Sequence, residues 1–304
     1  MIPPYLANVD PWIGETSCDS CYAQLDGDNP LGDALPDLML GRLPVRTVAE
    51  VETLVAKLIA YEAMPFGSWQ GRLISVADNM RNSSGEPETI NDFAAMAAES
   101  EAWFPAGTRV QRIFYDPDPA TSGEIGHERD AQQAYLHTRE AFQGGAAVVQ
   151  YVGHGSYWQW AYTAPTSTPS HLFGIQDAEA LISAAGLPVV LAWTCATSTI
   201  QLPSVRGSTI DEALVLNPAG AIATWGSSGL GVAYGHQYLH QGFARTLTGG
   251  ERELGALTMA GVWQLWSVGQ CCTDAIRTYH LLGDPLTQVQ FAPGYQLALP
   301  RLTR

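Results

Sequence analysis

Short apolar runs alternate with helical patterns over most of this 304-residue chain. Five runs have the length and composition of buried strands, at residues 72–77, 110–115, 146–152, 188–193 and 221–225. Helical patterns lie between and after them, at residues 90–104, 129–142, 177–185, 210–216, 232–247 and 253–267. Strands that alternate with helices are typical of a parallel sheet with helices on its faces. The sequence therefore predicts an α/β fold with a mostly parallel sheet.

The N-terminal part of the chain has a different composition. Residues 1–46 are rich in Gly, Pro and Asp and predict loops around one short strand near residues 38–45. Thr47 and Glu50 then form the sequence signature of a capping box, and apolar residues follow at helical spacing up to Ile59. This pattern predicts a helix that starts at Thr47. Because the chain opens in a Pro-rich, loop-like stretch, we expect that it begins part-way into a domain.

Charge and hydropathy exclude several classes of protein. The chain has 30 acidic residues against 15 Lys and Arg, for a net charge of −15. A nucleic-acid backbone needs a basic face, so we expect no nucleic-acid partner. No apolar run approaches the roughly 18 residues of a membrane span. The first residues also lack the basic and apolar regions of a signal peptide.

Reactive side chains follow three of the predicted strands. Asp78, His154 and Cys195 each come one or two residues after a strand ends. In open parallel sheets the active site lies outside the carboxyl ends of the strands. A thiol beside an imidazole is a nucleophile beside a base, and a carboxylate is the group that orients such a base. We therefore expect Cys195 and His154 to form a catalytic pair, with Asp78 as the third member.

Glycines on both sides of the histidine strengthen this interpretation. Gly153 and Gly155 allow close backbone approach, and the amides of Gly155 and Cys195 are candidates for an oxyanion hole. The alternative is that Cys195 is only a small apolar residue and His154 only a surface residue. That alternative is weaker for Cys195 and His154 together, because both residues follow apolar strands in the same series of alternating strands and helices.

Four further cysteines have no predicted role in this chemistry. Cys18 and Cys21 form a CxxC pair, and Cys271 and Cys272 are adjacent. One CxxC without a second is weak support for zinc or for a redox motif. We expect either local disulfides or reduced thiols, and keep a thiol–disulfide protein that uses Cys18 and Cys21 as an alternative function.

The segments around these side chains resemble the gingipain family of cysteine peptidases. The resembling segments lie at residues 151–156 with Trp160, and at 187–197, 211–214, 217–223, 226–229 and 282–285. Upstream, residues 26–28, 36–37 and 41–44 also match. The resemblance covers most of residues 20–290, and the order of the His, Cys and Gly-Ser-Ser-Gly motifs is specific.

The resemblance implies a fold and a domain organisation. The family's catalytic subdomain is caspase-like, with three α/β/α layers, and would comprise residues 71–292. Residues 1–70 would be the C-terminal part of a first, truncated α/β subdomain, and residues 293–304 a tail. The resemblance also gives Cys195 the role of nucleophile, His154 that of general base and acid, and Asp78 that of the supporting acid.

Family members that cleave after Arg or Lys place an acid at the base of the S1 pocket. The candidates here are Glu88 and Asp92. The alternative for Asp92 is a simple place in the first turn of a helix. Trp158 and Trp160 are candidates for the wall of a peptide-binding cleft, or for a cover on the sheet end.

Calcium is a further expectation from the resemblance. Asp26 and Asp28 lie in an oxygen-rich loop of the kind that suits this cation. The alternative is a solvated turn. The chemistry itself requires no cofactor.

These expectations combine into one hypothesis. The chain would be a cysteine endopeptidase that hydrolyses peptide bonds through an acyl-enzyme on Cys195, in the extracellular space or cell envelope of a bacterium, with cleavage after Arg or Lys as one option. Its partner would be a polypeptide substrate. The rival is a non-catalytic gingipain-like envelope or scaffold protein that retains the fold. An active site is expected to show one fast-reacting thiol with a depressed pKa.

Overall fold

A seven-stranded sheet forms the centre of the protein, with the strand order β12-β11-β10-β6-β3-β4-β5. Its strands are β3 (Arg72–Ala77), β4 (Arg109–Tyr115), β5 (His127–Glu128), β6 (Val148–Val152), β10 (Val189–Trp193), β11 (Ala223–Ser227) and β12 (Tyr279–Leu282). All neighbouring pairs are parallel except β11 with β12. The computed structural model describes residues 2–26, 29, 32, 34–81, 86, 91–118, 124–163, 168–182, 185–202, 208–269 and 271–293. The predicted α/β fold with a mostly parallel sheet is confirmed.

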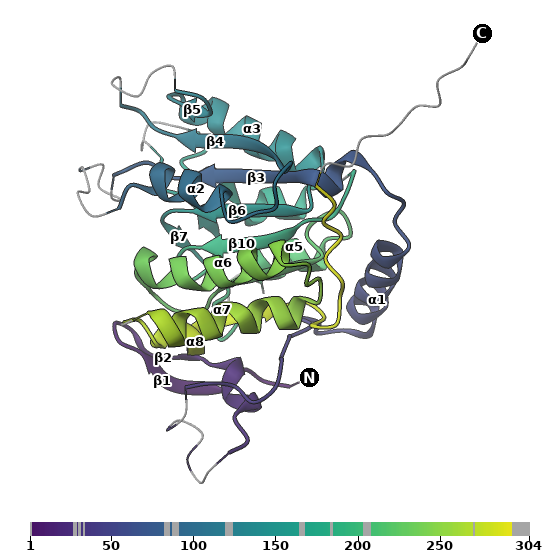
Figure 1. Ribbon diagram of the computed structural model, residues 1–304, viewed down its shortest axis with the longest axis vertical. Helices are drawn as coiled ribbons and strands as arrows, with labels where there is room; N and C mark the ends of the chain where they lie inside the picture. The colour runs from purple at the N-terminus through teal and green to yellow at the C-terminus, as the bar shows by residue number, and fades with distance from the viewer. Residues whose placement is uncertain are drawn as a thin grey trace.

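Helices cover both faces of the sheet (Figure 1). The α-helices of the described residues are α1 (Val48–Glu62), α2 (Phe93–Glu101), α3 (Ala131–Gln143), α4 (Ile175–Glu179), α5 (Ile210–Leu216), α6 (Ala233–Thr248), α7 (Leu254–Val268) and α8 (Asp274–Thr278), of which α1 covers neither face. Alternate strand residues face opposite layers: Val148 and Val152 lie in the core with α2, α6 and α7, whereas Val149 and Tyr151 lie in the core with α3, α4 and α5. The three-layer arrangement follows directly from this alternation.

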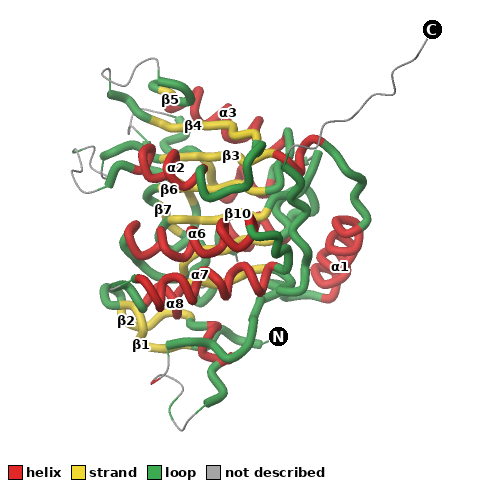
Figure 2. Tube along the Cα trace, viewed as in Figure 1, coloured by secondary structure: helices red, strands yellow, loops and turns green. Residues whose placement is uncertain are grey.

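The loops that matter for function gather at one end of the molecule. The parallel strands point the same way, and the long connections after β3, β6 and β10 lie at their carboxyl ends (Figures 1 and 2). A small three-stranded sheet of β7 (Gly155–Ser156), β8 (Gln159–Trp160) and β9 (Phe173–Gly174) follows β6 at this end. Helix α1 lies at the opposite end of the strands (Figure 1).

The helix predicted from Thr47 is present, and its capping box is formed in full. The prediction of a strand near residues 38–45 is wrong, because that stretch makes only an isolated bridge from Arg42 to Leu282. Instead, a hairpin of β1 (Leu6–Asp10) and β2 (Gly14–Ser17) forms within the stretch predicted as loops. Its strands are too short for their sequence pattern to stand out, and they are stabilised by packing against α8.

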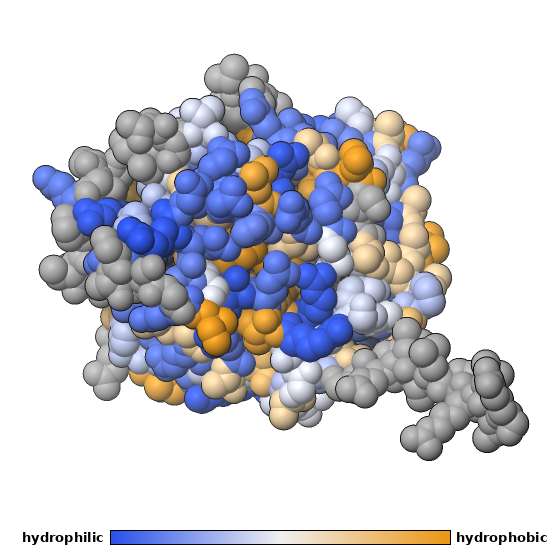
Figure 3. Space-filling view, turned by 90° about the horizontal axis from the view of Figure 1, so that it is seen from above, coloured by the Kyte–Doolittle hydropathy of each residue, from blue (hydrophilic) through white to orange (hydrophobic). Residues whose placement is uncertain are grey.

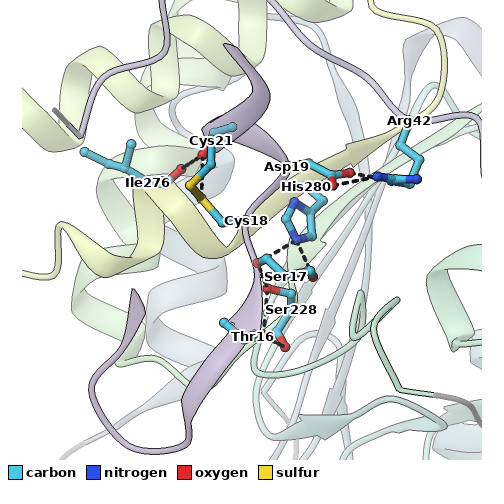
Figure 4. Close-up of a disulfide and its surroundings, with 10 residues drawn as sticks. Thr16, Ser17, Cys18, Asp19, Cys21, Arg42, Ser228, Ile276 and His280 are labelled. Carbon is cyan, nitrogen blue, oxygen red and sulfur yellow. Dashed lines mark hydrogen bonds and ion pairs between the residues drawn. A yellow bond between two sulfur atoms is a disulfide. The ribbon is translucent and has the colours of Figure 1, made fainter. Parts of the chain in front are cut away.

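Side-chain contacts fix the N-terminal segment to strand β12 (Figure 4). Arg42 and Asp19, both in this segment, form an ion pair with Nη2–Oδ1 at 2.7 Å, and the Arg42 amide donates to the Leu281 carbonyl of β12 at 2.8 Å. Ser17 Oγ lies 2.8 Å from Nε2 of His280 on β12. The short 3-10 helix η1 (Asp19–Ala23) follows Cys18, and a second one, η3 (Ser68–Gly71), precedes β3. The described part of the N-terminal segment therefore runs along one edge of the central sheet.

The surface is mixed in polarity. Figure 3 views the molecule from the top of Figure 1, and it shows hydrophobic side chains scattered among hydrophilic ones. Over the residues that the structure describes, no helix combines the length and the apolar character needed to cross a membrane.

Candidate active site

The parallel pairing of β6 and β10 places His154 beside Cys195. Val152 is the register partner of Trp193, and His154 and Cys195 each lie two residues after these partners. The pairing continues past the strands, because the Gly153 amide donates to the Trp193 carbonyl at 3.3 Å. The structure therefore brings the two predicted residues to the same edge of the sheet.

The two segments touch directly at Gly155. A Cβ atom at this position would lie 2.5 Å from Thr194 Oγ1 and 3.2 Å from the carbonyl oxygen of Cys195. Only a glycine fits such an approach without displacing backbone or a packed side chain. Gly155 therefore lies in close contact with the Cys195 segment.

The side chain of Asp78 contacts the main chain of His154. The carboxylate is buried at the end of β3, and its Oδ2 accepts a hydrogen bond from the His154 backbone amide at 3.3 Å. Oδ1 accepts from the backbone and side-chain nitrogens of Asn79, each at 2.8 Å. The imidazole of His154 packs edge-on against the Phe93 ring, with centroids 5.1 Å apart. Asp78 thus positions the segment that carries the histidine.

Cys195 is the cysteine that takes no part in a disulfide, and it is partly exposed. Its Sγ donates to the carbonyl oxygen of Gly231 at 3.4 Å. Burial of the sulfur raises the thiol pKa, and the negative charge of Asp10 adds to this effect. This direction is opposite to the depressed pKa expected for an active-site thiol.

The chain turns sharply after Cys195. Ala196 has a φ of 58°, a left-handed conformation that is uncommon outside glycine. Its amide donates to the Gly229 carbonyl at 2.8 Å, and the Ser198 amide donates to the Ser227 carbonyl at 2.9 Å. These bonds fasten the nucleophile segment to the chain that leaves β11.

The buried carboxyl group of Asp211 holds the segment that follows Cys195. Asp211 on α5 has no exposed surface, and its Oδ2 accepts from Ser198 Oγ at 2.6 Å. Burial raises the pKa of Asp211 to about 6. A Cβ on Gly226 would lie 2.4 Å from the same oxygen, so strand β11 packs directly against the Asp211 carboxyl group. Sequence reasoning matched residues 211–214 to a family motif but missed this role.

Asp10 is a second residue that sequence reasoning missed. It is buried at the end of β1, and its Oδ2 accepts from the Leu230 amide at 2.6 Å. Its Oδ1 accepts from the amides of Trp12 and Ile13 at 2.8 and 2.9 Å. The local sequence shows only an Asp followed by a Pro and two apolar residues. The contact of Asp10 with Leu230 joins residues that are 220 positions apart, so no local pattern predicts it.

The predicted specificity residues have different surroundings. Asp92 is the N-cap of α2, and its Oδ1 accepts from the Ala95 amide at 2.9 Å. Asp92 therefore has the helical role considered for it, and its role in specificity stays a prediction. Glu88 lies outside the described residues, so the structure gives no position for it.

The two tryptophans after the histidine also differ. Trp158 is 47% exposed, and its Nε1 donates to Gln159 Oε1 at 2.8 Å. Trp160 has no exposed surface and stacks on Tyr151 with ring centroids 4.6 Å apart. Trp160 thus belongs to the core rather than to the wall of a cleft, because the small sheet of β7 to β9 folds it inward.

The acidic N-terminal loop offers little for a cation in its described part. Asp26 is exposed, and its amide shares the Asp37 Oδ2 acceptor with that of Leu25, at 3.3 and 2.6 Å. Asp28 lies outside the described residues. Where the structure describes the chain, no group of three or more His, Cys, Asp and Glu side chains is arranged for a metal ion.

The remaining cysteines form two local disulfides, Cys18–Cys21 and Cys271–Cys272. The first bond lies at the start of η1 (Figure 4). Cys18 and Cys21 are 0% and 3% exposed. Thiol–disulfide exchange needs access for an attacking thiolate. This burial disfavours the alternative in which the pair exchanges disulfides with other proteins.

Known proteins show where this chain belongs. A model of peptidase family C25 matches residues 1–290. The structure is similar to the Arg-specific cysteine proteinase gingipain R (TM-score 0.65, 19% identity) and to the complex of the pro- and mature domains of RgpB from Porphyromonas gingivalis (TM-score 0.63, 19% identity). Each likeness covers 90% of this chain and 60% of the other, so the chain spans 60% of their length. A search of curated protein sequences found no match. The family match over residues 1–290 shows that the chain belongs to peptidase family C25, the gingipain family.

Proposed function

We propose that this chain is a cysteine endopeptidase in which Cys195 is the nucleophile and His154 the general base and acid. One observation carries the proposal: the β6–β10 register and the contact at Gly155 bring the two segments together at the carboxyl edge of the sheet. A thiol and an imidazole at one edge suit attack on a peptide carbonyl. The substrate would be a polypeptide, and the thiol–imidazole chemistry needs no cofactor.

The reaction begins from a protonated thiol. His154 takes the proton of Cys195 as the sulfur attacks the carbonyl carbon of the scissile bond. The amides of Gly155 and Cys195 would hold the resulting oxyanion. The carbon–nitrogen bond then breaks, and His154 returns the proton to the leaving amine. Water, deprotonated by His154, cleaves the thioester and releases the acid and the thiol.

The raised thiol pKa makes the base essential to this scheme. Burial disfavours the thiolate, and transfer of the thiol proton to His154 would supply the nucleophile. Substrate binding must also displace the Sγ–H bond to Gly231. Asp78 assists by fixing the main chain of His154.

Cleavage after Arg or Lys is the specificity we propose, with Glu88 or Asp92 as the acid. Its support is the likeness to a proteinase described as Arg-specific. The exposed ring of Trp158 would line the same cleft. An extracellular or cell-envelope location of a bacterium is supported by the two disulfides, since such bonds persist in oxidising compartments. A structural calcium at Asp26 and Asp28 remains a proposal from the family resemblance.

A fluorogenic peptide library tests the function. Peptides with Arg, Lys, Leu or Asp before the reporter group are assayed with the wild type and with His154→Ala, with and without calcium. The proposal expects hydrolysis by the wild type that falls at least about a thousandfold in the variant. A wild-type rate at background would favour the non-catalytic scaffold instead, and equal rates above background would contradict the role of His154. Circular dichroism of both proteins checks that the variant is folded.

A further inference from the structure

Three exposed apolar side chains lie on the hairpin tip and on the loop after β11. Trp12 and Ile13 at the tip of the β1–β2 hairpin are 53% and 49% exposed, and Leu230 is 37% exposed. Figure 1 shows that the tip reaches the same end of the molecule as the carboxyl ends of the parallel strands. Large apolar side chains at a functional edge are typical of binding surfaces.

A buried carboxylate holds these residues together. Asp10 accepts the amides of Trp12 and Ile13 on one oxygen and the amide of Leu230 on the other. The approach is close, because a Cβ on Gly229 would lie 2.1 Å from Asp10 Oδ2. Charge-assisted bonds to a buried carboxylate are strong. The hairpin tip is therefore fixed to the loop in one arrangement.

The same loop contacts the nucleophile. Gly231, next to Leu230, accepts the hydrogen bond from Cys195 Sγ, and Gly229 accepts the Ala196 amide. Asp10 is near enough that its charge acts on the Cys195 thiol. The loop that carries Leu230 therefore lies directly against the nucleophile segment.

We propose that Trp12, Ile13 and Leu230 form a substrate subsite that binds a bulky apolar side chain of the polypeptide, near the scissile bond. This subsite rests on the proposed function, since the occupant is the peptide held at Cys195. Asp10 is its positioning residue. The hairpin thereby becomes part of the substrate-binding face rather than a structural appendage.

The occupant is tested by alkylation as well as by hydrolysis. Peptidyl chloromethyl ketones that carry Leu, Phe, Ser or Asp at each successive position react with Cys195, and intact-mass spectrometry follows the rate. Each rate is divided by the rate with iodoacetamide, which reports the thiol alone. The same series as fluorogenic peptides, extended beyond the scissile bond, gives kcat/KM. Wild type, Ile13→Ser, Leu230→Ser and Ile59→Ser are compared.

Ile59→Ser is the matched control for Ile13→Ser. Ile59 is 63% exposed on α1, at the opposite end of the strands. We expect the wild type to prefer Leu or Phe over Ser and Asp at one position by about tenfold or more. Ile13→Ser and Leu230→Ser should lose most of that preference and keep the rates with Ser peptides. Ile59→Ser should match the wild type in every assay.

The outcomes separate this inference from the proposed function. Equal discrimination by the wild type and the two subsite variants, or no preference for apolar side chains at any position, would overturn the subsite. A preference in alkylation without any hydrolysis supports the subsite and contradicts the peptidase. Thermal unfolding midpoints of all four proteins show whether each variant is folded.

Discussion

The thiol of Cys195 donates to the carbonyl oxygen of Gly231 at 3.4 Å, so the resting nucleophile is held by the loop that follows β11. Burial of the sulfur raises the pKa of this thiol. The site depends on long-range contacts: Asp10 from the N-terminal hairpin and Asp211 from α5 fix the two segments that meet at this sulfur.

Alkylation by iodoacetamide should follow the raised pKa of Cys195. The thiolate is the reactive form, and burial keeps its population low at neutral pH. We expect the rate to rise steadily from pH 7 to above pH 9, without a plateau near neutrality. A plateau between pH 5 and 7 would show a pre-formed thiolate. Stopped-flow labelling followed by mass spectrometry measures the profile.

Gly155→Ala should nearly abolish activity. A methyl group at residue 155 would lie 2.5 Å from Thr194 Oγ1, so the two catalytic segments must move apart. Displacements of about 1 Å in an active site cost on the order of a hundredfold in rate. Gly249→Ala is the control, because its added carbon comes no closer than 3.3 Å to another atom. Equal kcat/KM for the two variants would contradict the role of the contact.

Asp78→Asn should lower kcat by about ten- to a hundredfold and leave KM within a factor of two. The amide is a weaker acceptor than the carboxylate for the His154 backbone amide, so the histidine segment loses its fixed position. Asp116→Asn, at the end of the neighbouring strand β4, is the control and should retain the wild-type kcat. A change in KM alone would place Asp78 in substrate binding instead.

Asp211 should make stability depend on pH. Its pKa is about 6 in the folded protein against an ordinary value of 3.8. Between these values the folded state binds more protons than the unfolded state, so this group's contribution falls as pH rises from about 4 to about 6. At pH 7 the cost is about 3 kcal/mol. Urea unfolding at pH 4 and pH 7 should show that Asp211→Asn gains stability relative to the wild type at the higher pH.

Lys57→Met should destabilise the fold by about 1–3 kcal/mol. The buried amino group of Lys57 donates to the carbonyl oxygens of Val215 and Asn217 at 2.8 and 2.7 Å, at the end of α5. The variant leaves these acceptors buried and unsatisfied. Glu52→Met, at an exposed position on the same helix, should change stability by less than about 0.5 kcal/mol. Urea denaturation compares both with the wild type.

Sequence patterns predicted the sheet and the meeting of His154 with Cys195 because both depend on local features. Apolar runs define the strands, and parallel strands end at one edge. The partners of the loop after β11 were not predictable in this way. Asp10 reaches Leu230 from a hairpin whose short strands have no clear pattern, and hydrogen bonds between segments so far apart leave no local signal.

Trp158 and Trp160 show a second limit of sequence patterns. Both follow the histidine motif closely, yet Trp158 is 47% exposed whereas Trp160 stacks inside the core. Residue type and neighbourhood in sequence do not fix which way a side chain faces. The thiol pKa was missed for a related reason, since burial of the sulfur depends on segments distant in the chain.

The central claim is an acyl-enzyme on Cys195, and rapid-quench mass spectrometry tests it most directly. Wild type and Cys195→Ala are mixed with a good peptide substrate, quenched in acid within milliseconds, digested and mapped. The account predicts an acyl adduct on the peptide that contains Cys195, formed in step with the first release of amine, and neither adduct nor turnover in a folded Cys195→Ala variant. Turnover without an adduct, retained in that variant, would contradict it.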